Sequence, residues 1–168
     1  MGFMRGAALA VLLLAVCAGF CFAADPAEGY WISVDDKGKK RSGWELYLLN
    51  GNLCGKMVSA PATPHNARAS KCRESYQGFP IPGKVNEMMI VGTPWIFGLT
   101  MERPGHWTNG SVINPENGKI YKCKMTFHPA DGKRYPTDVL EMRGEIGLGI
   151  GRSQFWQKST AEEVNALH

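Results

Sequence analysis

The sequence predicts an all-β protein, specifically a single antiparallel up-and-down β-barrel of about eight strands. One observation is the alternation of apolar and polar side chains along residues 119–128, which is the period of a strand with one buried face. A second is the turn cluster at residues 114–118, between two strand-like runs. A third is the series of glycines within residues 139–157, where a strand must bend or approach another strand closely.

The other strands are expected in sequential order. Residues 30–34 are strand-like and end at the turn DDKGKK. Residues 44–48 alternate in polarity, and Asn50-Gly51 then gives the strongest two-residue hairpin signal, leading into residues 53–59. The remaining predicted strands are residues 107–113, residues 119–128, a segment around Leu140 and Met142, and residues 152–157.

Two segments are harder to assign. Residues 61–83 are rich in Pro, Ser, Ala and Asn, which predicts a long loop. Residues 88–101 are apolar, but three helix-breaking residues interrupt them, so their structure stays open; these are Gly92, Pro94 and Gly98. Residues 158–168 are expected to form a polar tail.

The first 23 residues have the pattern of a cleaved signal peptide. They carry one basic residue, Arg5, then an apolar run, and they end in small residues suited to cleavage after Ala23. A membrane-anchoring helix is the alternative, but the apolar run is near the lower length limit for spanning a bilayer. We therefore expect a secreted or periplasmic protein in which residues 24–168 form one domain.

The net charge and the spacing of possible metal-ligating residues argue against several classes of function. The formal net charge of +4 at pH 7 is too mild and too dispersed to indicate nucleic-acid binding. The basic run at residues 37–41 is more typical of a solvated hairpin tip. The histidines and cysteines lack the short spacings of zinc sites. We therefore expect no nucleic-acid partner, no metal and no cofactor.

Three cysteines remain after signal cleavage: Cys54, Cys72 and Cys123. An oxidising compartment favours pairing, and an odd number leaves at least one thiol over. Cys123 falls on the buried face of its strand, and Cys54 follows a hairpin, so a Cys54–Cys123 disulfide is one hypothesis. The other pairings, and three free thiols with packing roles, stay open.

Spaced residues across most of residues 25–157 carry a family resemblance. They are Asp25-Pro26, Gly29-Tyr30-Trp31, Asn50-Gly51, Gly55-Lys56, Trp107, Gly110, Pro115, Gly118-Lys119, Tyr121, Arg143-Gly144, Ile146-Gly147, Gly151-Arg152, Gln154 and Trp156. With these residues the chain resembles the bacterial secreted family called domain of unknown function 2147. The resemblance implies an extracytoplasmic protein of a Gram-negative-type envelope, with a calycin-like barrel similar to that of lipocalins. It implies no established reaction.

The triplet Gly29-Tyr30-Trp31 is also similar to the G-x-W signature of lipocalins. That resemblance implies a barrel floor in which Trp31 lies at the closed end, under an arginine from the last strand. Arg152 is the first candidate for this arginine and Arg143 the second, because a guanidinium can stack on an indole ring. The alternative is that Trp31 is an ordinary core residue.

Apolar and aromatic side chains are available to line the barrel. The candidate ligand-binding residues are Trp95, Phe97, Trp107, Tyr121 and Met125. We expect residues 61–83 and 88–101 to border the open end, with Trp95 and Phe97 at or near the mouth. The alternative is that all these side chains fill the interior as core.

Three classes of function follow. The leading one is a non-enzymatic binding protein that carries a small hydrophobic molecule or lipid, with peripheral membrane association as an option. The second is a structural or interaction module of the envelope with a filled barrel. The third is an enzyme, which is disfavoured because His106 beside Glu102 and Arg103, or Cys72 beside some histidine, has no supporting motif. The sequence leaves the ligand and the oligomeric state open.

Overall fold

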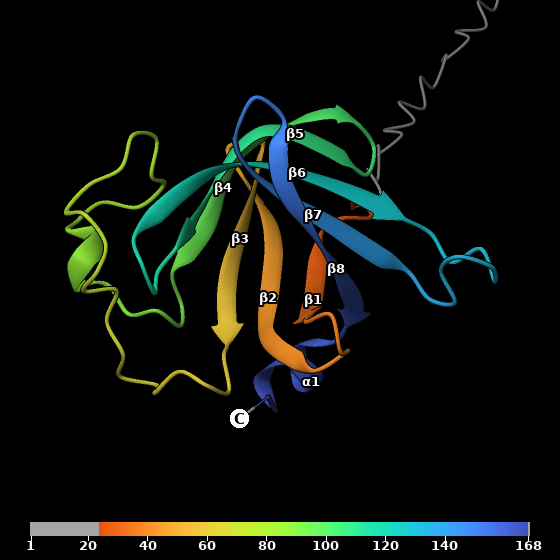
Figure 1. The fold of residues 1–168 in the computed structure, drawn as a ribbon, viewed down its shortest axis with the longest axis horizontal. Helices are drawn as coiled ribbons and strands as arrows, with labels where there is room; N and C mark the ends of the chain where they lie inside the picture. Colours follow the sequence, from red (N-terminus) through yellow and green to blue (C-terminus); the bar gives the residue numbers. More distant parts are fainter. Residues whose placement is uncertain (1–23, 168) are drawn as a thin grey trace, which may run out of the picture.

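The structure, a computed structural model, describes residues 24–167. Eight strands form one closed barrel in which each is antiparallel to its sequence neighbours and β1 pairs with β8 (Figure 1). The strands are β1 (Gly29–Val34), β2 (Lys40–Leu49), β3 (Asn52–Ser59), β4 (Pro94–Arg103), β5 (His106–Asn114), β6 (Lys119–His128), β7 (Val139–Gly147) and β8 (Ile150–Ser159). The predicted fold class is thus confirmed. The predicted signal peptide, with Cys17 and Cys21, lies outside the described residues.

The strand predicted at residues 119–128 matches β6 residue for residue. Its alternation places Cys123 and Met125 in the core, each about 1% exposed. The turn before it closes through a hydrogen bond from the Gly118 backbone N–H to the Asn114 carbonyl, at 2.8 Å. Local polarity and turn chemistry therefore fix this hairpin, as expected.

The ambiguous apolar segment becomes β4, which contains a β-bulge. Leu53 of β3 pairs with Leu99, but Gly55 pairs with Ile96, so β4 holds one extra residue. Gly98 absorbs the bulge with a φ of +71°, in the left-handed region that glycine tolerates. As a result Ile96 and Leu99 both face the barrel interior, whereas the side chains between and before them face outward.

The long segment between β3 and β4 packs against the outside of the barrel and contains a short 3-10 helix, η1 (Val85–Glu87). It forms the yellow-green lobe at the left of Figure 1. The Tyr76 hydroxyl donates to the Gly118 carbonyl at 2.7 Å, which ties the segment to the β5–β6 turn. A Cβ at Gly118 would overlap the Lys71 carbonyl oxygen, so only glycine permits this close approach.

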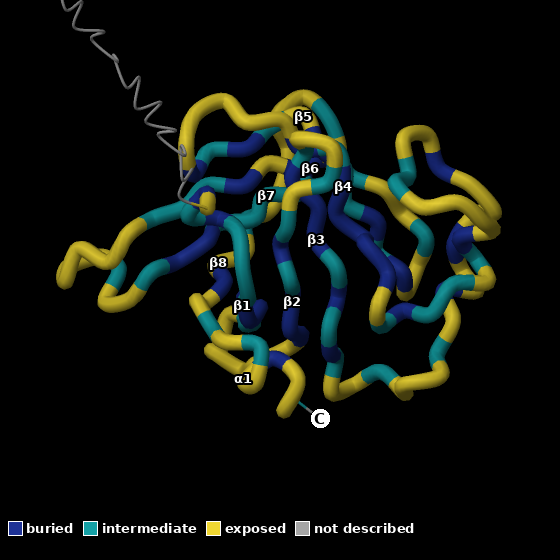
Figure 2. The backbone as a smooth tube through the Cα atoms, turned by 180° about the vertical axis from the view of Figure 1, so that it is seen from behind, coloured by how far each residue is buried: buried dark blue, intermediate teal, exposed yellow. Residues whose placement is uncertain are grey.

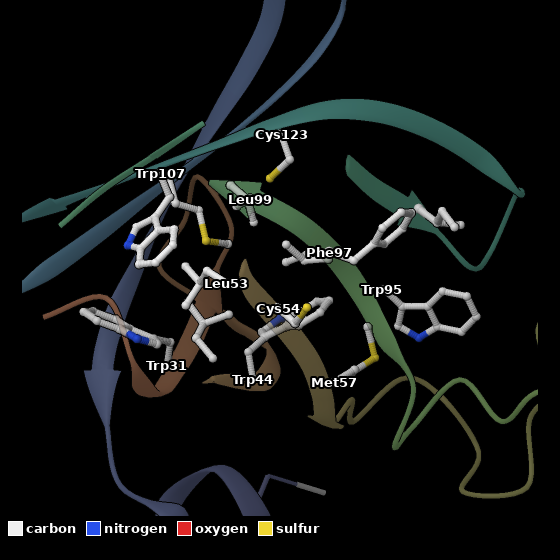
Figure 3. Packing of buried hydrophobic residues seen from close by; sticks show 14 of the residues in the cluster. Trp31, Trp44, Leu53, Cys54, Met57, Trp95, Phe97, Leu99, Trp107 and Cys123 are labelled. Carbon is white, nitrogen blue, oxygen red and sulfur yellow. The ribbon is translucent and has the colours of Figure 1, made fainter. Parts of the chain in front are cut away.

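The interior of one half of the barrel is filled by large apolar side chains. Burial is concentrated along the strands, while most connecting loops are exposed (Figure 2). The side chains that fill this closed half are at most 2% exposed and comprise Trp31, Leu46, Leu53, Leu99, Trp107, Met125 and Leu140. Several of them meet in Figure 3.

A short helix, α1 (Ala161–Asn165), follows β8 in the segment expected to be a polar tail. The Thr160 hydroxyl accepts a hydrogen bond from the Glu163 backbone N–H and caps it. Val164 is fully buried against the outer face of the barrel, where it lies over Gly43 and its carbonyl accepts from the Ser59 hydroxyl. Within residues 24–167, no helix is both long enough and apolar enough to cross a lipid bilayer.

Candidate functional site: the barrel cavity

A cavity of about 920 Å³ lies in the half of the barrel opposite the filled core. It opens at the end where the β1–β2 and β5–β6 turns and the start of β8 come together. Its apolar lining includes Trp44, Met57, Val112, Met142 and Trp156. These residues come from β2, β3, β5, β7 and β8, so the cavity is a property of the closed barrel rather than of one motif.

The floor of the cavity is a pair of stacked indole rings. The ring centroids of Trp44 and Trp156 are 5.1 Å apart and the ring planes are inclined by 21°. Trp156 is fully buried and Trp44 is 7% exposed, so the stack separates the hollow half of the barrel from the filled half. An apolar group that fills the cavity would therefore rest on the indole rings at its bottom.

Polar side chains beside the floor form hydrogen bonds with one another. The Trp44 Nε1–H donates to Ser42 Oγ at 2.7 Å, and Ser42 Oγ lies 2.6 Å from Ser33 Oγ. The Trp156 Nε1–H donates to Gln154 Oε1 at 3.2 Å. Both indole donors are therefore satisfied inside the barrel, and the wall presents polar groups without an unpaired charge.

The rim of the cavity carries charged side chains, several of them paired. Arg41 forms an ion pair with Asp35 at 2.9 Å, and Arg152 with Asp36 at 2.6 Å. Backbone hydrogen bonds, led by that of Lys39, lower the pKa of Asp35. Three further rim residues, Lys37, Lys39 and Glu116, form no ion pair with a described residue.

The closed end of the barrel differs from the predicted barrel floor, in which an arginine lies over Trp31. Trp31 is fully buried and its Nε1–H donates to the Ala27 carbonyl at 2.8 Å. The cation above its ring is Lys158, whose Nζ lies 4.4 Å from the ring centroid and donates to the Glu28 carbonyl at 2.8 Å. The predicted contact between Trp31 and Arg152 is wrong, because Trp31 pairs in register with Lys158 and Arg152 lies at the open end.

Asp25 completes the closed end of the barrel, near Gly29, which begins β1 with a φ of +107°. The residue pattern of the sequence indicates no such structural role for Asp25. Its carboxylate accepts hydrogen bonds from the Trp107 Nε1–H at 2.9 Å, the Gly105 N–H at 2.8 Å and the Ala27 N–H at 2.9 Å. The N-terminal segment therefore closes this end, and access to the interior is through the other end.

Trp95 and Phe97 lie on the outer side of β4, which corrects their expected place at the mouth. The Phe79 ring from the long segment lies 6.2 Å from Trp95 and 5.4 Å from Phe97, and the Trp95 Nε1–H donates to the Ile90 carbonyl at 2.7 Å. Figure 3 shows Trp95 on the far side of β4 from Trp31 and Trp107. The long segment thus covers these rings and extends the hydrophobic core beyond the barrel.

The other predicted ligand residues also lie away from the cavity lining. Trp107 and Met125 belong to the filled half of the barrel. Tyr121 is not part of the cavity lining and borders a separate hollow beside β5 and β6. Of the two segments expected at the mouth, residues 61–83 and 88–101, the cavity lining includes only Ala62, Thr63 and Ile90. Ligand binding by the five predicted residues remains a prediction.

The three cysteines of the described chain are free and buried, so the predicted Cys54–Cys123 disulfide is wrong. Cys54 is on β3 and Cys123 on β6, and these strands are not neighbours in the barrel. Burial raises the pKa of the Cys123 thiol to about 12, and burial also raises the pKa of Cys54 and Cys72. Burial therefore disfavours the thiolate, which is the nucleophilic form, in all three, and each contributes to packing.

Two polar clusters have residue types used in catalysis, and one of them includes Ser153, which borders the cavity. Glu141 accepts from Ser153 Oγ at 2.6 Å and lies 3.0 Å from His128 Nε2. Burial raises the pKa of Glu141, but the two hydrogen bonds and the nearby charges, including that of Arg143, together lower the pKa overall. The carboxylate stands between serine and histidine, so the histidine is not placed to activate the serine. His106 contacts the exposed Arg103. Residues 24–167 hold no cluster of three His, Cys, Asp or Glu side chains suited to a metal.

Comparison with known proteins agrees with this architecture. A solved structure of protein HP1028 from the human pathogen Helicobacter pylori, described as a member of the lipocalin family, superimposes with a TM-score of 0.63. The two sequences are 17% identical, and the match covers 83% of this chain and 87% of that one. This likeness shows the fold, which is lipocalin-like.

No curated protein matches the sequence significantly. The model of the bacterial family described as "Uncharacterized protein conserved in bacteria (DUF2147)" matches residues 29–158, which span all of β1 to β7 and nearly all of β8. The chain therefore belongs to the DUF2147 family and has a lipocalin-like barrel.

Proposed function

We propose that the protein is a non-enzymatic binding protein that holds a small amphipathic molecule in the barrel cavity. The observation that carries the proposal is the cavity of about 920 Å³ above the Trp44–Trp156 stack. Small-molecule sites are concave, mostly apolar and of about 300–1,000 Å³, with few polar groups. A barrel half-filled by side chains and half-hollow has the shape that such a site requires.

The lining indicates what such a molecule would look like. Its apolar part would rest on the indole stack and against Met57 and Met142, which adapt to irregular shapes. Its polar head would lie at the rim, where Lys37 and Lys39 have no carboxylate partner among the described residues. A fatty acid or a similar anionic amphiphile fits this arrangement.

The place of action that we propose is the bacterial envelope or the exterior. The signal-like pattern of residues 1–23 supports export. Sequencing the amino terminus of protein recovered from culture is the test. A chain that starts at Ala24 agrees with the proposal, and a cytoplasmic chain that starts at Met1 contradicts it.

Native mass spectrometry of protein purified from its own cells tests for a ligand. We expect an additional mass of lipid size that is lost on denaturation. A bare protein mass in repeated preparations would favour the alternative, a structural or interaction module with an unused cavity.

A cavity variant tests where the ligand sits. Val112→Phe places a larger side chain in the cavity wall, and Thr100→Phe adds the same ring on the exposed surface of β4 as the matched control. We expect Val112→Phe to weaken binding of a dansyl-labelled fatty acid about tenfold or more and Thr100→Phe to leave it unchanged. Equal affinities in both variants and the wild type would show that the probe binds elsewhere.

A further inference from the structure

The turn between β7 and β8, together with the strand residues beside it, exposes three large aliphatic side chains. Ile146, Leu148 and Ile150 are 71%, 101% and 62% exposed. In Figure 1 this turn is the blue loop that stands clear of the strands at the top of the barrel. Isolated apolar residues are common on surfaces, but three on one protruding turn form a cluster that no part of the described chain covers.

Leu148 is an unusual choice at its position for a second reason. Its φ is +48°, in the left-handed region where glycine, asparagine and aspartate are favoured. A fully exposed leucine there gains no burial within the chain and adopts a disfavoured backbone conformation. Leucine at this position is therefore unfavourable in free energy in the isolated protein, and contact with an apolar partner would offset this.

A basic hollow adjoins this turn. It has a volume of about 500 Å³, and Ile146 lines it together with the exposed Ile120. Its cationic side chains are Arg73, Lys119 and Lys122. Its one carboxylate, Glu145, is already held by Lys124 at 3.3 Å and Arg143 at 2.9 Å. Lys119 and Lys122 form no ion pair within the described chain.

The apolar turn is also close to the opening of the cavity. Arg152, which follows the turn in β8, forms its ion pair with Asp36 of the β1–β2 turn at the rim. Exposed aliphatic side chains, unpaired lysines and the cavity opening are thus gathered at one end of the barrel.

We propose that this end of the barrel docks on an anionic lipid surface. The Ile146, Leu148 and Ile150 side chains enter the boundary between head groups and acyl chains, and Lys119 and Lys122 bind lipid phosphates. Apolar anchors with adjacent cations are the combination by which proteins bind a bilayer surface without spanning it. The proposal goes beyond ligand binding and stands without it.

Charge favours a lipid surface over a second copy of the chain. In a two-fold symmetric dimer through this turn, each basic hollow would approach its own equivalent, so like charges would meet. A bilayer that contains phosphatidylglycerol supplies an apolar interior and the opposite charge together.

Vesicle flotation tests the proposal. We expect the wild-type protein to float with vesicles of phosphatidylethanolamine and phosphatidylglycerol, and to float less with phosphatidylcholine vesicles or at high salt. Leu148→Asn removes the aliphatic side chain while suiting the left-handed backbone, and it should weaken binding about tenfold. Met101→Asn is the matched control, because Met101 is 47% exposed near the closed end.

The double variant Lys119→Gln, Lys122→Gln should also bind about tenfold more weakly and lose most of its salt dependence. Near-ultraviolet circular dichroism of the stacked indoles Trp44 and Trp156 shows separately that each variant keeps its fold. No flotation of the wild type, or equal flotation of Leu148→Asn and Met101→Asn, would overturn the proposal. A dimer that Leu148→Asn abolishes, without any vesicle binding, would overturn it in favour of a second copy.

Discussion

Trp44 and Trp156 stack with their ring centroids 5.1 Å apart, although β2 and β8 are not neighbours in the barrel. β1 lies between these strands, and its inward-facing Ser33 takes up little space. The small side chain lets the two indoles meet across it, while its hydroxyl joins Ser42 beside the stack. The stack therefore reports directly on whether the barrel is closed.

Circular dichroism should detect this stack. Two indoles at this separation couple their transitions and give a pair of bands of opposite sign. We expect Trp44→Phe to abolish the pair while changing the free energy of unfolding by less than about 2 kcal/mol, because a ring still covers Trp156. Phe155→Leu, which leaves both indoles in place, should keep the pair. If Trp44→Phe kept it, the stack would not be its source.

Trp95→Ala should destabilise the protein and leave ligand binding intact. Deleting a fully buried tryptophan costs about 3–5 kcal/mol, and Trp95 packs under Phe79 outside the barrel. Urea denaturation measures the loss, and fatty-acid titration of the folded protein measures binding. A variant with unchanged stability and tenfold weaker binding would contradict this and indicate that Trp95 lies at the mouth of the barrel.

The position of Trp95 shows what alternation along a sequence can and cannot predict. In β6 the alternation is uninterrupted, so the buried face can be assigned correctly from residue types alone. In β4 the bulge at Gly98 shifts the pattern by one residue, so the faces on either side of it exchange. Gly98 can be recognised in the sequence. The packing of the long segment over Trp95 and Phe97 cannot, because the contacts of a loop leave no periodic pattern in its residues.

Removing the Asp25 carboxylate should open the closed end. Asp25→Ala leaves the Trp107 indole N–H and the Gly105 N–H without acceptors in a buried place, at a cost of about 3 kcal/mol. Asp36→Ala is the matched control, because Asp36 is 84% exposed and its ion pair with Arg152 stabilises by less than about 1 kcal/mol. Equal losses in the two variants, measured by urea denaturation, would contradict a structural role for Asp25.

The buried Cys123 thiol should make stability fall at alkaline pH. Burial raises its pKa from the ordinary 9.0 to about 12 in the folded protein, so only the unfolded chain ionises at intermediate pH. Ionisation stabilises the unfolded state, and the thiol's contribution to folding is full below about pH 9 and is lost as the pH rises toward about 12.

Comparison with Cys123→Ala isolates this effect from other titrating groups. The variant should be less stable than the wild type at neutral pH, because it leaves a space in the core. The difference in unfolding free energy should then shrink steadily above about pH 9. A difference that stays constant across the alkaline range would mean that the thiol titrates alike in both states.

The cation over Trp31 illustrates a second limit of the sequence. A cationic side chain from the last strand was expected there, and the structure has one, but it is Lys158 rather than Arg152. The choice depends on the register between β1 and β8, which pairs Trp31 with Lys158 and is set by the whole circuit of the barrel. Bulges in the intervening strands each change that register by a residue, and their sum cannot be obtained from local patterns.

The pairing of β1 with β8 also governs how the chain reaches its native state. The ribosome synthesises β1 first and β8 last. One edge of β1 therefore has no hydrogen-bonding partner until β8 has emerged. During that interval the nascent protein is an open sheet whose two borders can pair with other chains. A chain cut short before Ile150 would keep both borders, those of β1 and β7, and we expect it to aggregate rather than persist as a smaller barrel.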